Sequence, residues 1–219
     1  MGYSIAIDGP AGAGKSTIAK LIAKERGCIY VDTGAMYRAM AIYFLRQGIA
    51  AEDEAAITEA CKDIEVVIKY EDNVQNVYLN GENVTSILRT EEVGKMASAS
   101  SVYGAVRAKL LDLQRKLAKD YDVVMDGRDI GTHVLPDADV KIYMTASVEE
   151  RANRRYKELV EKGDTTADYE KIKADIAERD YRDMNREIAP LKQAEDAILL
   201  DTSDMSIEEV VKAIIACCK

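Results

Sequence analysis

The sequence predicts an α/β fold: a five-stranded parallel sheet with helices on both faces and a small antiparallel β insert. Three observations support this prediction. Short apolar runs typical of buried strands alternate with longer segments whose apolar residues recur at helical spacing. The first run leads directly into a glycine-rich turn and a helical pattern. The middle of the chain instead carries β-branched residues around an Asn-Gly pair, which favours a tight hairpin.

The first strand–loop–helix unit is Ser4–Lys24, and its turn fits G-x-x-x-x-G-K-[S/T], the pattern of a loop that binds nucleotide phosphates. Its glycines let the backbone approach phosphate oxygens, and the N–H groups of the loop and of the helix start attract anions. We expect Lys15 to reach the β- and γ-phosphates and the Ser16 hydroxyl to hold Mg²⁺. A turn that merely joins strand and helix is the alternative, but the position between the two favours a nucleoside triphosphate site. The loop comprises Gly9, Pro10, Ala11, Gly12, Ala13, Gly14, Lys15, Ser16 and Thr17.

The remaining core elements are predicted from short apolar runs for strands and from helical periodicity for helices. Helix starts are marked by Thr90, by Ser147 with Glu150 completing a capping box, and by Ser206 with Glu209. The expected strands are Ile29–Asp32, Asp122–Asp126, Val140–Met144 and Ala197–Leu200, and the expected helices are Ala35–Arg46, Asp53–Cys61, Glu91–Ala97, Tyr103–Ala118, a segment from Ser147 toward Lys162, Tyr169–Glu187 and a C-terminal helix after Ser206.

The β insert is expected where the helical pattern is interrupted. Ile64–Tyr70, Asn76–Leu79 and Val84 are rich in β-branched and aromatic residues. Asn80-Gly81 is a strong hairpin signal, because a tight two-residue turn needs positive φ angles.

Polar residues follow three strands of the predicted sheet, namely Gly9, Asp32-Thr33-Gly34 and Asp126–Asp129. The carboxyl ends of parallel strands share one edge, where ligands bind, so we expect these segments to meet. In the second segment, Asp32 or Thr33 can cap the following helix, and Arg38 can clamp a phosphate of a second substrate. The spacing alone leaves both roles open.

The segment Asp126–Asp129 also has two interpretations. Asp126 can support Mg²⁺, as acidic residues at such strand ends do in phosphate-loop enzymes. Arg128 can grip a phosphate with two hydrogen bonds, and Asp129 can accept hydrogen bonds from a base or sugar. The alternative is an ordinary Asp-Gly turn with a surface ion pair.

The last third of the chain contains two arginine-rich helical segments. Arg179, Asp183 and Arg186 share one helix face at i, i+4 and i+7. Such charge runs are usually solvated faces held by i,i+4 pairs. Gly163 and the polar residues after it would instead let the two helices close as a flap over phosphates. The charged residues concerned are Arg151, Arg154, Arg155, Arg179, Asp180, Arg182, Asp183 and Arg186.

Composition narrows the class of protein. A formal charge of −9 argues against a general nucleic-acid or membrane surface, so an anionic substrate needs local basic clusters. No apolar stretch approaches the length of a bilayer-spanning helix, and the chain enters its first strand without a signal peptide, so we expect a cytoplasmic protein. We also expect a monomer. Zinc binding is not expected, because the four cysteines show no C-x-x-C spacing: Cys28, Cys61, Cys217 and Cys218.

Over nearly its whole length the sequence resembles the bacterial cytidylate kinases, a family of nucleoside monophosphate kinases. The resemblance rests on six blocks whose order and spacing are more specific than the phosphate loop alone. They are GPAGAGKST at Gly9–Thr17, DTGAMYRA at Asp32–Ala39, RTEEV at Arg89–Val93, GRDIGT at Gly127–Thr132, PDADVKIY at Pro136–Tyr143 and RDYRDMNREIAPL at Arg179–Leu191.

The resemblance implies a P-loop kinase fold and ATP-dependent phosphorylation of CMP and dCMP, with Mg²⁺. One domain would comprise a core (about 1–34, 102–150 and 188–219), an insert that binds the monophosphate (about 35–101) and a helical lid (about 151–187). By resemblance, Gly9–Thr17 bind ATP; Thr33, Arg38 and Arg128 hold the monophosphate; Ser98, Arg107 and Asp129 contact the cytosine edge; and Arg179, Asp183 and Arg186 contact sugar and phosphates as the lid closes. Lys15, Arg128, Arg179 and Arg186 are the expected catalytic residues.

Three other functions share parts of this pattern. The nearest is another small-molecule kinase on the same scaffold, such as one that accepts both UMP and CMP. A GTP-hydrolysing switch usually carries an Asn-Lys-x-Asp motif, which this sequence lacks. A non-catalytic nucleotide-binding module would have no need of Lys15, Arg38, Arg128 and Arg186. The sequence does not decide between CMP and dCMP as the preferred substrate.

Overall fold

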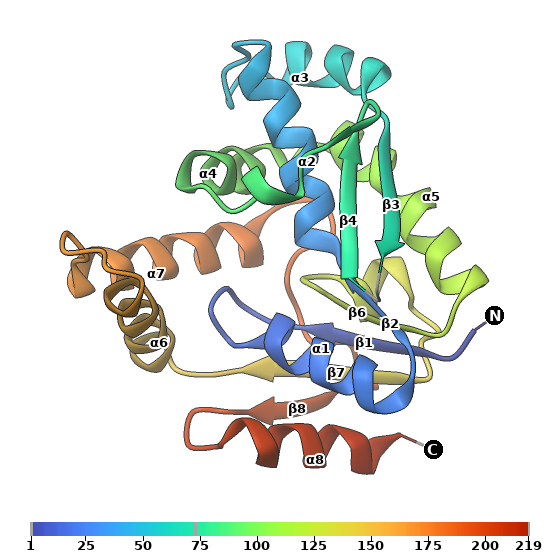
Figure 1. The fold of residues 1–219 in the computed structure, drawn as a ribbon, viewed down its shortest axis with the longest axis vertical. Coiled ribbons are helices and arrows are strands. Elements are labelled where there is room, and N and C mark those ends of the chain that lie inside the picture. Colours follow the sequence, from blue (N-terminus) through green and yellow to red (C-terminus); the bar gives the residue numbers. More distant parts are fainter. Residues whose placement is uncertain (1, 72–73, 219) are drawn as a thin grey trace.

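A computed structural model describes residues 2–71 and 74–218, and it contains the predicted five-stranded parallel sheet. The strand order is β2-β6-β1-β7-β8, and every neighbouring pair is parallel. Consecutive strands are therefore joined by crossover connections, and their carboxyl ends lie at one edge of the sheet (Figure 1). The strands are β1 (Ser4–Asp8), β2 (Ile29–Asp32), β6 (Val123–Gly127), β7 (Val140–Thr145) and β8 (Ile198–Asp201).

Helices cover both faces of this sheet because its strands are apolar on both sides. In β1, Ile5 and Ile7 pack with apolar residues of α1 (Lys15–Arg26) and α8 (Ile207–Cys217). Ala6, which points to the opposite face, belongs to the larger cluster that includes residues of α2 (Thr33–Arg46) and α5 (Gly104–Asp120).

The insert lies between α2 and α5 and contains the predicted antiparallel sheet, of order β3-β4-β5. Asn80 and Gly81 have φ angles of 47° and 86° and form the turn between β4 and β5, which confirms the hairpin prediction. The connection between β3 and β4 falls at residues 72–73, outside the described part. The elements are α3 (Glu54–Ala60), a 3₁₀ turn (Cys61–Asp63), β3 (Val66–Glu71), β4 (Val74–Leu79), β5 (Glu82–Asn83), a 3₁₀ turn (Thr85–Ile87) and α4 (Glu91–Ser100).

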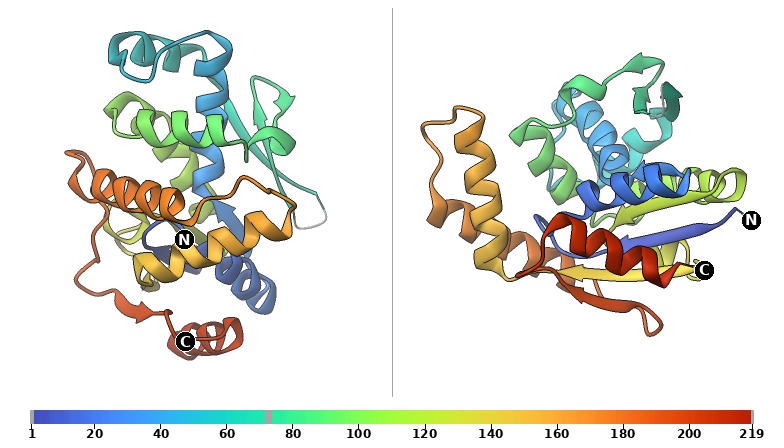
Figure 2. Two further views of the ribbon diagram at one scale, coloured as in Figure 1. Left: turned by 90° about the vertical axis from the view of Figure 1, so that its left-hand side faces the viewer. Right: turned by 60° about the horizontal axis from the view of Figure 1, so that its bottom comes forward.

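Two helices, α6 (Val148–Glu161) and α7 (Tyr169–Asn185), lie side by side at the carboxyl edge of the sheet (Figure 2). Both chain termini lie at the opposite edge (Figure 1). Helix α7 ends at Asn185, two residues before the predicted Glu187, because the backbone of Arg186 is extended. The Arg186 side chain donates to the carbonyl of Ala189 in the segment that follows.

The predicted capping box at the start of α6 is wrong in one half. The Ser147 hydroxyl accepts the N–H of Glu150 at 3.1 Å, as expected. The Glu150 carboxylate, however, pairs with Arg154, and the Ser147 N–H donates to Ser203. A complete capping box occurs at Ser206 and Glu209, before α8. None of the helices in the described residues is long and apolar enough to cross a bilayer.

Candidate active site

One cavity of about 710 Å³ opens where the predicted strand ends meet. The phosphate loop from Ala11 onward, Asp32-Thr33-Gly34 and Asp126–Asp129 all line it, together with side chains of α6 and α7. The segments after β2 and β6 therefore meet here as expected, and the phosphate loop that begins at Gly9 joins them from Ala11 onward. Gly9 and Pro10 lie outside this lining. The other predicted site residues on the wall are Arg38, Ser98, Arg107, Arg179, Asp183 and Arg186.

The phosphate loop has the backbone that its glycines were expected to provide. Gly9 has a φ of 150°, and a Cβ there would lie 1.9 Å from the carbonyl oxygen of Met144, so no larger residue fits. The Lys15 side chain is buried, and its ammonium donates to the carbonyl of Pro10 at 2.7 Å. Burial, and then the charge of Arg128, lowers the pKa of Lys15.

Ser16 and Asp126 form an oxygen-lined corner beside this loop. The Ser16 hydroxyl donates to one carboxylate oxygen of Asp126 at 2.9 Å, and the Tyr30 hydroxyl donates to the other at 2.8 Å. Burial, and then the neighbouring Asp32, raises the pKa of Asp126. A hydroxyl and a carboxylate are oxygen donors of the kind that Mg²⁺ prefers, so this corner fits such an ion. Tyr30 was missed in the sequence because it sits within an apolar strand pattern.

The segment after β2 caps the following helix and also brings Arg38 to the cavity, where its role as a phosphate clamp stays a prediction. Asp32 is the N-cap of α2 and accepts the N–H of Ala35 at 2.9 Å. Thr33 donates its hydroxyl to the carbonyl of Asp126 at 2.7 Å, and Arg38 lines the cavity one turn further along the helix. Burial lowers the pKa of Arg38.

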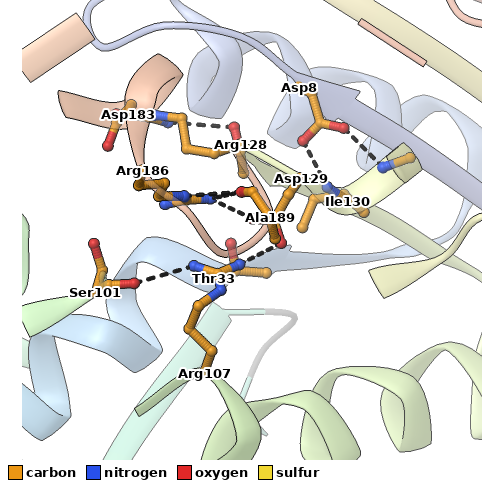
Figure 3. Close-up of polar contacts among 12 residues, drawn as sticks. Asp8, Thr33, Ser101, Arg107, Arg128, Asp129, Ile130, Asp183, Arg186 and Ala189 are labelled. Atoms are coloured by element: carbon orange, nitrogen blue, oxygen red, sulfur yellow. Dashed lines mark hydrogen bonds and ion pairs between the residues drawn. The ribbon is translucent and has the colours of Figure 1, made fainter. Parts of the chain in front are cut away.

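The segment after β6 is part of a buried ionic network, which excludes the interpretation as a surface turn (Figure 3). Arg128 donates to Asp183 of α7 at 2.8 Å. Burial of the guanidinium acts to lower the pKa of Arg128, but the carboxylates around it, Asp183 first among them, raise it overall. Asp129 pairs with Arg107 of α5 and, at 3.1 Å, with Arg186. The guanidinium of Arg107 also lies 5.7 Å from the ring centroid of Tyr37.

Asp8, the last residue of β1, holds the loop that carries Arg128 and Asp129. Its carboxylate accepts the N–H groups of Ile130 and Gly131 at 2.8 and 2.7 Å, which secures the π-helical turn that begins at Ile130 (Figure 3). Burial raises the pKa of Asp8 to about 6, although the two backbone N–H groups act in the opposite direction. An acidic residue ending an apolar strand was the only signal in the sequence for this role.

Arg179 lies in a concentration of positive charge. Its Nε atom is buried without a hydrogen-bond partner among the described residues. Burial, and then Arg128, lowers the pKa of Arg179 to about 10. Ser98, expected near the base, receives a hydrogen bond of 3.2 Å from Arg182. A guanidinium that faces a cavity and is in none of the ion pairs of the described residues is typical of a site for an anion.

The arginines of α6 play different parts. Arg151 donates to the carbonyl of Ala11 in the phosphate loop at 2.9 Å and pairs with Asp180 of α7 at 2.7 Å, which ties both α6 and α7 to the loop. Arg154 binds Glu150 and the carbonyl of Thr202. Arg155, which also lines the cavity, pairs with Glu158 on the same helix. The bridging position of Arg151 could not be inferred from its spacing.

Comparison with known proteins agrees with this geometry. A family model described as cytidylate kinase matches residues 5–219. A cytidylate kinase of Exiguobacterium sp. is 54% identical over 210 residues, which cover 96% of this chain and 93% of that protein. One from Bacillus cereus is 50% identical over 213 residues, covering 97% and 94%. Among solved structures, a gluconokinase from Sinorhizobium meliloti shares the fold, with a TM-score of 0.50 at 14% identity and coverage of 98% and 90%. The chain belongs to the cytidylate kinase family.

Proposed function

We propose that the protein transfers the γ-phosphoryl group of ATP to CMP and dCMP, forming ADP and CDP or dCDP. Membership of the cytidylate kinase family supports CMP as acceptor and does not favour a UMP/CMP kinase. The observation that carries the mechanism is the convergence of Lys15, Arg38, Arg128 and Arg179 on one cavity. Four cations gathered in this way suit two phosphorylated substrates, which otherwise repel each other.

The chemistry is an in-line displacement. An oxygen of the CMP phosphate attacks the γ-phosphorus of ATP, a new P–O bond forms, and the bond to the β–γ bridging oxygen breaks as ADP leaves. Because the attacking oxygen is already ionised near neutral pH, no general base is needed. The protein aligns the two phosphates and neutralises their charge.

Each region contributes to that alignment. The phosphate loop and Lys15 hold the ATP phosphates, and Thr33, Arg38 and Arg128 hold the CMP phosphate. Arg107 and Arg186, oriented by Asp129, border the base and sugar with Ser98, while Asp183 orients Arg128. Arg179 belongs to the lid and neutralises charge on the transferred group. Mg²⁺ held by Ser16 and Asp126 would supply further positive charge to the ATP phosphates.

A coupled assay of ADP release tests the proposal across CMP, dCMP, UMP, AMP and GMP. We expect kcat/KM to be highest for CMP and dCMP, and activity to be lost when EDTA removes Mg²⁺. A higher kcat/KM for UMP or a purine monophosphate, or ADP release without any acceptor, would contradict the proposal. Sedimentation of the same preparation tests the expected monomer.

A further inference from the structure

The insert is attached to the outer edge of the main sheet by side chains. Strand β2 is one of the two edge strands of the main sheet, and strand β4 of the insert contacts it (Figure 1). Edge strands present unpaired backbone N–H and C=O groups. Here two side chains from the hairpin occupy such groups, one from each of its strands.

Gln75 of β4 makes the closer attachment. Its amide oxygen accepts the N–H of Asp32 at 2.9 Å, and its amide nitrogen donates to the C=O of Asp32 at 3.3 Å. The side chain thus pairs with both backbone groups of one residue, as a neighbouring strand would. From β3, the Tyr70 hydroxyl donates to the carbonyl of Tyr30 at 3.1 Å.

Asp32, whose backbone Gln75 binds, also contacts several other parts of the site. The Asp32 carboxylate caps α2 and accepts a hydrogen bond from Arg89 at 3.2 Å. The Asp32 backbone is in register with Asp126 across β2 and β6. Thr33 and Arg38 follow on the same helix and line the cavity. The backbone position of Asp32 therefore sets where the first two turns of α2 present these two side chains.

We propose that Gln75 is a positioning residue for the acceptor nucleotide: by fixing the backbone of Asp32, it holds Thr33 and Arg38 in place for the phosphate of CMP. This inference rests on the proposed function for its substrate. It also assigns a positional role to the insert, because its strand β4 fixes the start of α2, the helix that is proposed to bind the monophosphate.

Steady-state kinetics of Gln75→Ala and Gln75→Glu test this role, with Asn76→Ala as the matched control. The Asn76 amide bonds stay within the insert, to Glu71 and Val74 at 3.4 Å. Loss of two hydrogen bonds typically shifts an equilibrium by about tenfold, so we expect Gln75→Ala to raise the KM for CMP about tenfold. The KM for ATP should change less than about twofold. Gln75→Glu retains the acceptor but loses the donor and adds a negative charge near Asp32, so its effect should be at least as large.

Two further measurements separate this inference from the proposed function and from a general loss of stability. A destabilised fold would lower the apparent kcat, because less of the enzyme is folded, without a selective rise in the KM for CMP. Backbone amide exchange at Asp32, measured without nucleotides, should be faster in Gln75→Ala than in wild type or Asn76→Ala. Unchanged exchange, equal KM changes for both substrates, or an equal effect of Asn76→Ala would overturn the inference. If wild type failed to phosphorylate CMP, the proposed function would fall, while the exchange experiment would still decide whether Gln75 fixes Asp32.

Discussion

Removing the carboxylate of Asp129 is expected to destabilise the folded protein, whatever its effect on the discrimination between CMP and other monophosphates. Asp129 pairs with Arg107 and Arg186, and all three side chains are at most 6% exposed. Asp129→Ala would leave two buried guanidinium groups without their shared counter-ion. Breaking one buried pair by removing a partner costs about 3–5 kcal/mol.

The remaining contacts place the expected value in the lower part of that range. Arg186 keeps two hydrogen bonds to the carbonyl of Ala189, and Arg107 keeps one to the carbonyl of Ser101 at 3.3 Å. We therefore expect the free energy of unfolding to fall by about 3–4 kcal/mol. For a chain of this size the midpoint of thermal unfolding should fall by about 6–16 °C.

Urea denaturation of wild type and Asp129→Ala, without nucleotides, measures this effect. Glu82→Ala is a suitable control, because it breaks an ion pair with Arg46 in which both partners are exposed, and we expect little change there. A loss of less than about 1 kcal/mol in Asp129→Ala would refute the role of Asp129 as a buried counter-ion. Only a variant that remains folded can then report on discrimination between CMP and other monophosphates.

Three other changes have distinct expected outcomes. Arg179→Met should lower kcat/KM by about 10²–10³ without lowering the thermal midpoint, because it removes an uncompensated cation; a marked loss of stability would argue against this. Because the pKa of Asp8 is raised to about 6 in the fold, the native state binds its proton more tightly, and the stability contributed by Asp8 falls as pH rises from about 4 to about 6. Urea denaturation at several pH values should show that fall in wild type but not in Asp8→Asn, and parallel curves would contradict it. Finally, ATP with CMP should slow proteolysis near Gly163 severalfold if α6 and α7 close, and equal rates would count against a lid.

Much of the fold was predictable because local patterns and tertiary structure agree. The five strands are short apolar runs, and in β1 alternate residues face two apolar layers, so the pattern of a buried parallel strand is unmistakable. The turn at Asn80-Gly81 was predictable because few other pairs adopt two positive φ angles readily. The capping box at Ser147 failed because the Glu150 carboxylate had a better partner in Arg154, one helical turn away.

The site was predictable where residue chemistry is specific and not where it depends on partners remote in sequence. The phosphate loop and the arginines follow from motifs. The attachments of Asp8 to Ile130 and of Arg151 to Ala11 span more than a hundred positions, and nothing near either residue indicates its partner. Asp129 was expected to contact cytosine, and that role stays a prediction, but its two arginine partners could be recognised only from the fold.

The distribution of charge around the cavity explains why the lid should respond to phosphate. The protein as a whole carries −9, so its long-range field does not attract anions, and attraction has to arise locally. Asp129 and Asp183 neutralise Arg107, Arg186 and Arg128, whereas none of the ion pairs among the described residues includes Lys15, Arg38 or Arg179. These three cations come from α1, α2 and α7 respectively. Arg38 and Arg179 lie close enough for each to feel the other's charge. This repulsion opposes the ion pair between Arg128 and Asp183, which joins α7 to the segment after β6. A phosphate monoester contributes about −1.5 to −2 charges at the centre of the group and reverses that balance. Phosphate binding should therefore draw α7 more tightly against the site, because the bound anion converts the repulsion among these three cations into attraction.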